Sequence, residues 1–503
     1  MQEFRGLRAW FFPIHLHELK KFLPLSLMMF FVVFNYQILR DTKDTLIVYA
    51  AGAKALSLIK LIGTVPGALL VVLIYSKLST FCTRQQLFYA VLGPFLLFFG
   101  LFGTCIYPNR ELLHPSSEWV ESLSSLYPRW STLFSVCGCW SYALFFVLAE
   151  LWGSVILSLL FWQLANDIAT LKEAKRFYPL FGLLANFAPV LAGLTTTFFS
   201  QAQSHSLNGA DPWGTTLNYL MGLVLLSGMA IIYIHRWIFR THNVSATIVH
   251  DKTKTKPSLK ESFLFLSKSK HLGYIALIVI CYGISENVIE GLWHEQLRSI
   301  YATQNDYSAF MGRVSMITGF TTVAFMIIGT NIVRLCGWYF SASLTPLVIA
   351  STGLFFFTLV TFKTELESSI FTLFGITPTL LAAWVGFFQI VVTKSIKYSL
   401  VDSTKEMCYI PLDPESKSKG KAAVEIVGGR LGKSGGAFFQ QMFLFITAGS
   451  LTSVAPYLAI VCLSVCVVWL LAVGKLDLSL QSYETHEPAP LPVEKQSNNQ
   501  GIA

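Results

Sequence analysis

Long apolar segments separated by short polar loops make up most of the chain. Each segment is long enough to cross a bilayer, because a transmembrane helix needs about 20 predominantly apolar residues. The pattern predicts an all-α polytopic membrane protein with twelve transmembrane helices, six before a polar stretch and six after it. Three segments exceed the bilayer thickness (23–50, 133–166 and 370–398), so we expect them to tilt, kink or protrude. The segments lie at about 23–50, 56–76, 86–106, 133–166, 178–200, 215–238, 271–297, 307–332, 341–362, 370–398, 421–448 and 451–474.

The composition agrees with a membrane location. Charged residues make up 13% of the 503 residues, against roughly 25% in globular proteins, and hydrophobic residues make up 53%. This excludes a soluble enzyme, a fibre and a disordered chain. The net charge of +9 does not indicate nucleic-acid binding, which needs a basic face on a folded domain. The cysteines and histidines have no spacing typical of a metal site, so we predict no metal and no cofactor.

The positions of the basic residues predict the topology. Cytoplasmic loops carry an excess of lysine and arginine, and an even number of spans with both termini in the cytoplasm produces that asymmetry here. No cleavage site follows the first apolar segment, so we expect it to remain as a span. The inside loops then hold Lys77, Arg84, Lys172, Lys175, Arg176, the stretch 239–270, Arg334 and the run Lys405–Lys421, and the outside loops hold Arg110, Arg129, Arg298 and Lys363.

A faint internal repeat suggests two six-helix halves. Lys, Glu, Tyr, Pro and Leu follow the fourth segment from Lys172 and follow the tenth from Lys405. With the six-plus-six count, this indicates parallel repeats as in the major facilitator architecture, with a cavity between the halves. The predicted divisions are a cytoplasmic segment 1–22, a six-helix bundle 23–238, a basic linker 239–270, a six-helix bundle 271–474 and a disordered cytoplasmic tail 475–503.

Charged residues inside the first segment are candidates for a binding site, because ionisable groups in a membrane are costly. Tyr36, Arg40 and Lys43 follow one another at helical spacing and would line one face. Two cations below an aromatic ring can hold a phosphorylated aromatic ligand. The alternative is that the helix ends near residue 39 and the charges reach the interface.

Three carboxylates lie deep in other segments. Glu150 has no cation nearby in the sequence, so it needs a partner on another helix or a proton. Glu286 and Glu290 share a face of the seventh segment, where like-charge repulsion makes one of them a candidate gate or proton carrier. Asn287 and Trp293 lie beside them, and a structural ion pair between helices is the alternative for Glu150.

The tenth and eleventh segments carry lysines with several interpretations. Lys394 and Lys397 share one face and could reach the inner interface, and Lys405 lies beyond them. The run VGGRLGKSGG resembles a phosphate-binding loop, but Val427 occupies a position that requires glycine, and no strand precedes it. We expect its glycines to permit close helix packing instead, with Lys433 at the inner interface or facing the cavity.

Several blocks resemble a known family. FNYQILRDTKDTLIV, AELWGSVILSLLFWQLANDI, EAKRFYPLFG, STKEMCYIPLD and KGKAAVEIVGGRLGKSGG are similar to blocks of the non-mitochondrial ATP/ADP translocases of plastids and obligate intracellular bacteria. The resemblance runs from about residue 13 to residue 475, and it is greatest to a chlamydial member. It implies a secondary transporter in the bacterial inner membrane that imports host ATP in exchange for ADP.

The resemblance also implies site residues. Four charged residues considered important in the family fall on Lys43, Glu150, Glu290 and Lys405. We expect Lys43, Lys405 and Arg40 to bind the phosphates and Glu150, Glu290 and Glu286 to act as gating or coupling carboxylates. Glu150 and Glu290 would pair with the two lysines when the site is empty. Candidate contacts to the base or other polar groups are Tyr36, Asn287, Trp293 and Asn186.

Other substrates and functions stay open at this point. The family also contains proton-driven importers of nucleotides and members that carry a broader range of nucleotides or NAD. Gln37, where a small hydroxyl residue is expected, and His294, where lysine is expected, leave the substrate branch undecided. Phosphate is a candidate co-substrate, and a monomer is sufficient. The competing class, a membrane-embedded phosphotransferase, would need a carboxylate or His/Asp cluster at one interface, and the sequence shows none.

Overall fold

The computed structural model describes residues 14–204, 211–241, 269–412, 420–421 and 423–486. Within these ranges the chain is helical and forms no strand. The main helices of the first part are α2 (Leu19–Ala50), α3 (Lys54–Ile59), α4 (Val65–Phe81), α5 (Arg84–Leu101), α9 (Trp140–Trp152), α10 (Trp162–Ile168), α11 (Leu171–Ala185), α12 (Phe187–Ser204) and α13 (Pro212–Thr241). Those of the second part are α15 (Lys270–Ile300), α16 (Gln304–Thr361), α18 (Pro378–Ile396), α19 (Asp402–Met407), α21 (Gly429–Thr447) and α22 (Ala455–His486).

Short helices and π-helical segments complete the chain. The π-helical segments continue neighbouring α-helices, so that a span such as Lys54–Phe81 contains both kinds. The π-helical segments are η2 (Lys60–Thr64), η3 (Phe102–Ile106), η5 (Gly153–Phe161), η6 (Lys397–Val401) and η7 (Val424–Gly428). The remaining short helices are η1 (Leu16–Glu18), α6 (Arg110–Leu113), α7 (Ser117–Leu126), η4 (Pro128–Trp130), α8 (Ser131–Gly138) and α17 (Lys363–Phe374).

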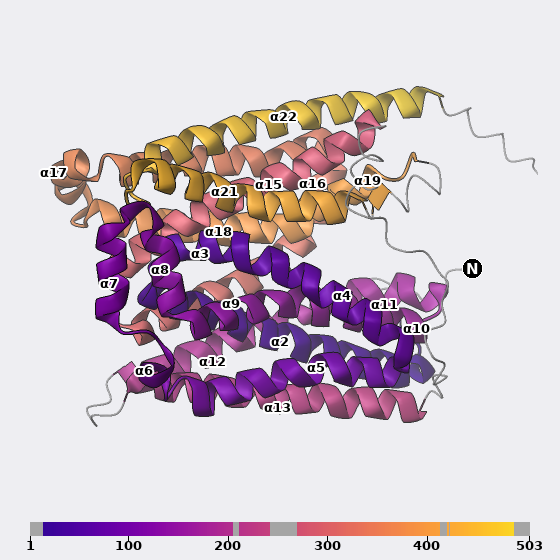
Figure 1. Cartoon of the computed structure of the whole chain (residues 1–503). Helices are drawn as coiled ribbons and strands as arrows, with labels where there is room; N and C mark the ends of the chain where they lie inside the picture. The colour runs from indigo at the N-terminus through magenta and orange to yellow at the C-terminus, as the bar shows by residue number, and fades with distance from the viewer. Residues whose placement is uncertain (1–13, 205–210, 242–268, 413–419, 422, 487–503) are drawn as a thin grey trace, which may run out of the picture.

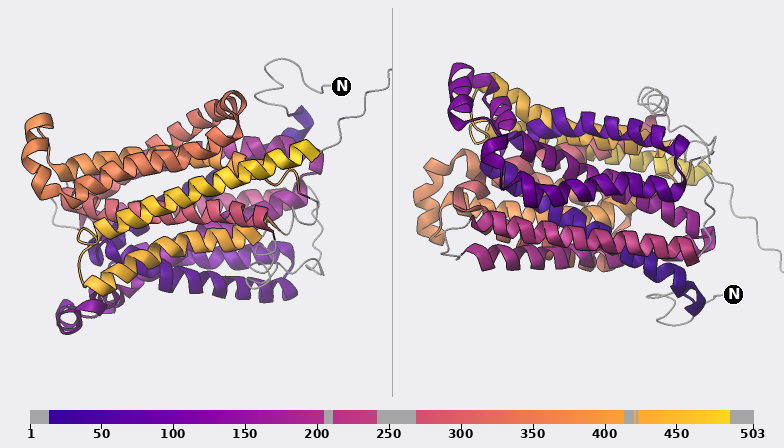
Figure 2. Two further views of the ribbon diagram at one scale, coloured as in Figure 1. Left: turned by 90° about the horizontal axis from the view of Figure 1, so that it is seen from above. Right: turned by 60° about the horizontal axis from the view of Figure 1, so that its bottom comes forward.

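The predicted spans agree closely with these helices. Eleven of the described helical stretches are long and apolar enough to cross a membrane. The predicted segment 421–448 corresponds to η7 and α21, which lie in the bundle although glycines, glutamines and charges lower their hydropathy. The helices run side by side, and α7, α8 and α17 lie together at one end (Figures 1 and 2). The beginning and end of the described chain lie at the opposite end, as an even number of spans requires (Figure 1).

Two of the over-long segments contain a break in their first part. The segment 133–166 is divided near Gly138, where α8 ends, and the membrane-length stretch begins at Trp140. The segment 370–398 contains the end of α17, where Gly375 has a φ of 68°, a conformation that favours glycine. The new span then begins at Pro378, with the Thr377 hydroxyl accepting a hydrogen bond from the Leu380 amide at 3.3 Å. The first over-long segment instead continues as the single helix α2.

Glycines allow two pairs of helices to approach each other closely. An ideal Cβ on Gly432 of α21 would lie 3.1 Å from the Val279 carbonyl oxygen and 3.2 Å from Gly283 Cα of α15, which confirms the packing role expected for this stretch. An ideal Cβ on Gly193 of α12 would overlap the Gly312 carbonyl oxygen of α16. The α12–α16 and α15–α21 pairs therefore meet through backbone atoms.

The C-terminal end differs from the sequence expectation. A disordered tail was predicted from residue 475, but α22 continues to His486. Its final turns keep hydrogen bonds such as that from Gln481 Nε2 to Asp477 Oδ2 at 2.7 Å. Residues 487–503 of the predicted tail lie outside the described residues, as do most of the predicted segment 1–22 and of the linker 239–270.

Candidate functional site

The first group of buried charges surrounds Glu290 on α15. Arg40 Nη2 of α2 and Lys394 Nζ of α18 each lie 3.1 Å from Glu290 Oε1. Lys60 Nζ of η2 lies 3.3 Å from Glu290 Oε2 and donates a hydrogen bond to Asn287 Oδ1 at 2.8 Å. We call Arg40, Lys60, Glu290 and Lys394 the Glu290 cluster. Its charged side chains are between 12% and 23% exposed, so their interactions are poorly screened by water.

The second group surrounds Glu150 on α9. Lys43 Nζ lies 2.6 Å from Asp44 Oδ1 and 3.1 Å from Glu150 Oε1, and its side chain is 3% exposed. The Lys43 ammonium also lies 4.1 Å from the centre of the Phe146 ring, a cation–π contact. Lys433 Nζ of α21 lies 3.9 Å from Glu150 Oε2. We call Lys43, Asp44, Glu150 and Lys433 the Glu150 cluster.

Helix α2 supplies a cation to each cluster. Arg40 and Lys43 are three residues apart, and the structure directs Arg40 to α15 and Lys43 to α9. The helix is continuous through both residues, so they do not belong to a fraying helix end. Tyr36 packs one turn earlier against Gly153, where an ideal Cβ would lie 2.8 Å from Tyr36 Cε2. The lack of a side chain at Gly153 therefore makes room for the Tyr36 ring.

A third polar group contains a carboxylate beside neutral partners. Asp41 is 2% exposed, and Gln37 Nε2 donates to its Oδ1 at 2.9 Å while Ser315 Oγ donates to its Oδ2 at 2.8 Å. Gln37 also donates to Ser315 Oγ at 2.8 Å, which links α2 to α16. Gln37, which departs from the small hydroxyl residue expected here, thus completes a hydrogen-bonded bridge between the two helices.

Two of the residues proposed for contact with the base lie elsewhere. Trp293 is 1% exposed, and its indole N–H donates to the Ala383 carbonyl at 2.9 Å, so its ring fills the packing between α15 and α18. Asn186 caps α11 by donating to the Gly182 carbonyl at 2.7 Å. Among the described residues, neither side chain has a hydrogen bond to a member of the two clusters. Asn287 joins the Glu290 cluster through Lys60, and Glu286 lines a pocket together with Glu290 and Lys394.

Lys405 is separated from Lys43. Lys405 Nζ lies 2.7 Å from Glu425 Oε1 and 3.4 Å from Asp402 Oδ1. The expectation that Glu150 and Glu290 pair with Lys43 and Lys405 therefore holds for Lys43 with Glu150, but Glu290 binds Arg40, Lys60 and Lys394 instead. The reason is helix length: α18, η6 and α19 are continuous, and eleven residues beyond Lys394 correspond to about 16 Å along the axis.

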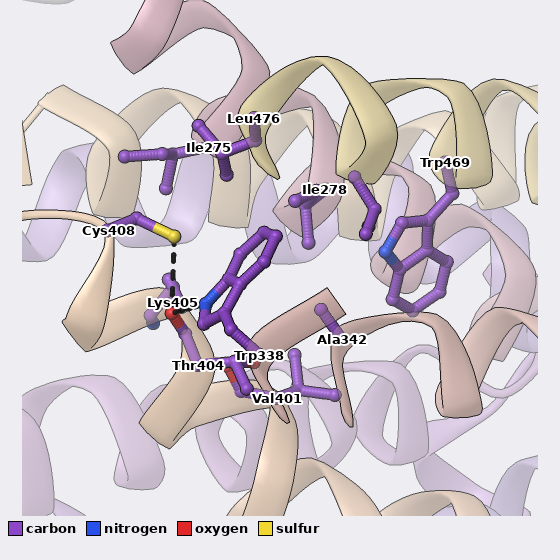
Figure 3. Close-up of a pocket in the computed structure, with 11 residues that line it drawn as sticks. Ile275, Ile278, Trp338, Ala342, Val401, Thr404, Lys405, Cys408, Trp469 and Leu476 are labelled. Carbon is purple, nitrogen blue, oxygen red and sulfur yellow. Dashed lines mark hydrogen bonds between the residues drawn. The ribbon is translucent and has the colours of Figure 1, made fainter. Parts of the chain in front are cut away.

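A small apolar pocket lies beside Lys405 (Figure 3). The indole N–H of Trp338 donates to the Thr404 carbonyl at 3.0 Å, and Cys408 Sγ donates to the same oxygen at 3.2 Å. Figure 3 shows these two interactions converging on Thr404, with Ile275 and Ile278 of α15 along another wall. The contacts fix the end of α19 within the second part of the chain.

Sequence reasoning missed Lys60 as a site residue. Its signal was a single lysine inside the apolar segment 56–76, close enough to the segment end to resemble an interfacial residue. The π-helical segment η2 begins at Lys60, η5 begins at Gly153 and η6 begins at Lys397, and π-helical turns are frequent at functional sites. No residue pattern in the sequence predicts these turns.

A bundle of membrane spans with charged side chains clustered in its interior is the architecture of a membrane transporter. The fold agrees with solved transporters: a bacterial homologue of the iron transporter ferroportin in an inward-facing state has a TM-score of 0.59 at 15% identity, covering 92% of this chain and 99% of the other. The nucleoside transporter NupG has a TM-score of 0.55 at 10% identity, covering 90% and 99%. These similarities concern the fold alone and confirm the major-facilitator-like prediction.

The chain belongs to the TLC ATP/ADP transporter family, whose model matches residues 1–480. ADP,ATP carrier protein 1 of Chlamydia pneumoniae is 45% identical over 486 residues, which cover 94% of each chain. The chloroplastic ADP,ATP carrier protein 2 of Arabidopsis thaliana is 40% identical over 489 residues, covering 97% of this chain and 79% of the other. The predicted family and the prediction of a transporter, not an enzyme, are thereby confirmed.

Proposed function

We propose that the protein exchanges ATP for ADP across a membrane by alternating access. The names of its relatives support these substrates. The observation that carries the proposal is the Glu290 cluster, in which Arg40 and Lys60 of the first six spans meet Glu290 and Lys394 of the later spans. A polyanion bound there would contact both parts of the chain, so its arrival could be coupled to their relative movement.

The buried carboxylates give a physical reason for exchange. In the empty carrier, Glu150 and Glu290 neutralise cations that a nucleotide would otherwise bind. Phosphates that enter compete for those cations, and a carrier left with unpaired buried charges would incur a cost of several kcal/mol. The empty carrier avoids that cost through its ion pairs from Glu290 to Arg40 and Lys60, which join the two parts of the chain. Phosphates that replace Glu290 would release these ion pairs, so reorientation is easier for the loaded carrier, and this favours counter-transport over one-way release.

The placement in the cell follows from the same proposal. We infer a bacterial inner membrane with both termini in the cytoplasm, because the basic loops would then lie inside. Two groups of six spans make a monomer sufficient, and phosphate is a further candidate substrate.

Proton-coupled nucleotide uptake is the second candidate function. The observation in its favour is Asp41, a buried carboxylate whose hydrogen-bond donors, Gln37 and Ser315, are neutral. A carboxylate in such surroundings can exchange a proton when a donor moves away. Exchange and proton-coupled uptake make opposite predictions for the same vesicles.

The test uses the purified protein in proteoliposomes that are empty or preloaded with ADP, with labelled ATP outside. Exchange predicts that uptake requires internal ADP and continues after a protonophore is added. Uptake that ignores internal ADP and collapses with the proton gradient would contradict the exchange proposal and support the second candidate.

A further inference from the structure

The two clusters differ in their balance of charge. The Glu290 cluster has three cations, Arg40, Lys60 and Lys394, around one carboxylate. The Glu150 cluster has two cations, Lys43 and Lys433, beside two carboxylates, Asp44 and Glu150. A phosphate chain entering the first cluster meets a net positive charge even when Glu286, which lines the same pocket as Glu290 and Lys394, is counted, whereas the second cluster is neutral. The clusters therefore cannot bind a polyanion equally well.

We propose that the Glu290 cluster is the subsite for the terminal phosphates of the nucleotide, that Lys60 and Lys394 are binding residues there, and that Glu290 is the internal counter-ion that the phosphates replace. The inference rests on the proposed nucleotide exchange and names the part of the site that distinguishes a diphosphate or triphosphate from a monophosphate. The Glu150 cluster then holds α2 and α9 together through the buried Lys43 and is not the main phosphate receptor.

The geometry of the Glu290 cluster suits a phosphate group. Arg40 Nη2 and Lys394 Nζ each lie 3.1 Å from the same carboxylate oxygen, so these two donors are at most about 6 Å apart, close enough for one phosphate group to contact both. Arg40 and Lys394 each make a single hydrogen bond to the described residues, both to Glu290. A guanidinium has five N–H donors and an ammonium three, so both can bind further oxygens.

The Lys43 ammonium is less available. Its hydrogen bond to Asp44 and its ion pair with Glu150 occupy it, and the Phe146 ring covers one side. Its side chain is 3% exposed, against 14% for Lys394 and 18% for Lys60. A phosphate reaching Lys43 would have to displace two carboxylates, whereas one reaching Lys394 displaces only Glu290.

A second observation points to a ligand beside Glu290. A pocket between α15, α16 and α18 is lined by Glu286, Glu290, Lys394 and the polar side chains of Gln389 and Thr393. Thr393 is 5% exposed, and its hydroxyl has no hydrogen-bond partner among the described residues. A buried hydroxyl without a partner is costly. Because Thr393 and Lys394 both line this pocket, the Thr393 hydroxyl is placed to donate to an oxygen of a phosphate group that enters it.

The test measures binding to the purified full-length protein in detergent, with ADP, AMP and inorganic pyrophosphate as probes. We expect Lys60→Ala and Lys394→Ala to weaken ADP and pyrophosphate binding about 10- to 100-fold each, as for a lost charged hydrogen bond, and AMP binding less than threefold. Lys394→Arg should restore most of the ADP affinity. Glu290→Gln should tighten pyrophosphate binding, because no counter-ion has to be displaced.

Two comparison variants make the assignment falsifiable. Lys421→Ala, which removes a lysine paired with the exposed Glu406, should leave all three affinities unchanged. Lys43→Ala should preserve the preference for ADP over AMP; if it abolishes that preference while Lys60→Ala and Lys394→Ala do not, the subsite is misassigned. If Glu290→Gln weakens pyrophosphate binding, Glu290 is not the counter-ion that the phosphates replace. Since these measurements need no transport, they can succeed even if the vesicle test rejects exchange.

Discussion

The two ends of the bundle are held together differently. At the end that carries α7 and α17, hydrogen bonds connect the first six spans to the later ones. Tyr49 donates its hydroxyl to the Tyr301 carbonyl at 2.6 Å, and Ser204 donates to Asp306 at 2.7 Å. Gln441 Nε2 donates to Ser57 Oγ at 2.7 Å. These contacts join the two parts of the chain and close this end of the molecule.

At the end that carries the termini, ion pairs lie within each part of the chain. Arg176 pairs with Glu18, and Lys21 pairs with Glu173 at 3.0 Å, all within the first six spans. Lys405 pairs with Glu425 and Lys421 with Glu406, each at 2.7 Å, within the later spans. This difference indicates how the carrier changes state. The closed end can open by breaking mainly neutral hydrogen bonds, which contribute about 1 kcal/mol each. The ion pairs at the other end lie within each part of the chain, so they stay intact when the parts move.

The largest effect should come from fixing the closed end covalently. The hydroxyls of Ser200 on α12 and Ser308 on α16 are 3.0 Å apart, so cysteines at both positions should form a disulfide on oxidation. We expect the oxidised Ser200→Cys, Ser308→Cys protein to lose exchange more than about 100-fold and to recover when reduced, because the ends could no longer separate. Each single variant is the control. Wild-type exchange by the oxidised protein would mean that this end does not open.

A bulky residue between α12 and α16 should have the next largest effect. Gly193→Val would place side-chain atoms where the Gly312 backbone now lies, so the helices would have to move apart. We expect a loss of about 1–3 kcal/mol or more in unfolding free energy, measured by thermal unfolding in detergent. Gly222→Ala on α13, where an added Cβ meets open space, is the matched control. Equal stability of the two variants would contradict the close crossing.

Removing a neutral hydrogen bond at the closed end should have a moderate effect. Gln441→Ala eliminates the bond to Ser57 and a second one to the Lys54 carbonyl at 2.8 Å. Each lost bond contributes about 1 kcal/mol. The equilibrium constant between the closed and the open state should therefore shift toward the open state by roughly tenfold or more. Labelling of a cysteine introduced in place of the buried Ala53 would report the opening while leaving the Ser57 hydroxyl in place. Unchanged labelling rates in the presence and absence of Gln441 would show that the bond does not hold this end shut.

The smallest effect on stability should come from the other end. Lys421→Ala removes an ion pair whose two side chains are 48% and 47% exposed, and such pairs contribute about 0–1 kcal/mol. We expect unfolding free energy and exchange to stay near the wild-type values. A large loss would mean that this pair also stabilises a state in which the terminal ends meet.

Much of the fold could be predicted from the sequence, because hydrophobic segments of membrane length must become helices in a bilayer. The sequence also identified Lys43, Glu150 and Glu290, since single charges in apolar runs are conspicuous. It could not identify their partners. Glu290 is 250 residues from Arg40 and 104 from Lys394, and ion pairs between helices depend on how the helices pack. The sequence likewise does not show that Lys405, which follows Lys394 on a continuous helix, pairs with Glu425 and Asp402 and not with Glu290.

The π-helical segment η6 has a consequence for comparing and engineering such carriers. Lys394 and Lys405 lie on either side of this five-residue segment within one continuous helix. Deleting one residue from η6 would rotate everything after it by about 100° relative to everything before it. Lys394 would keep its direction while Lys405 turned away from Glu425. If an alignment of two such carriers has a one-residue gap at this point, the helix end beyond the gap is rotated in one carrier relative to the other. Residues aligned beyond the gap then need not face the same neighbours.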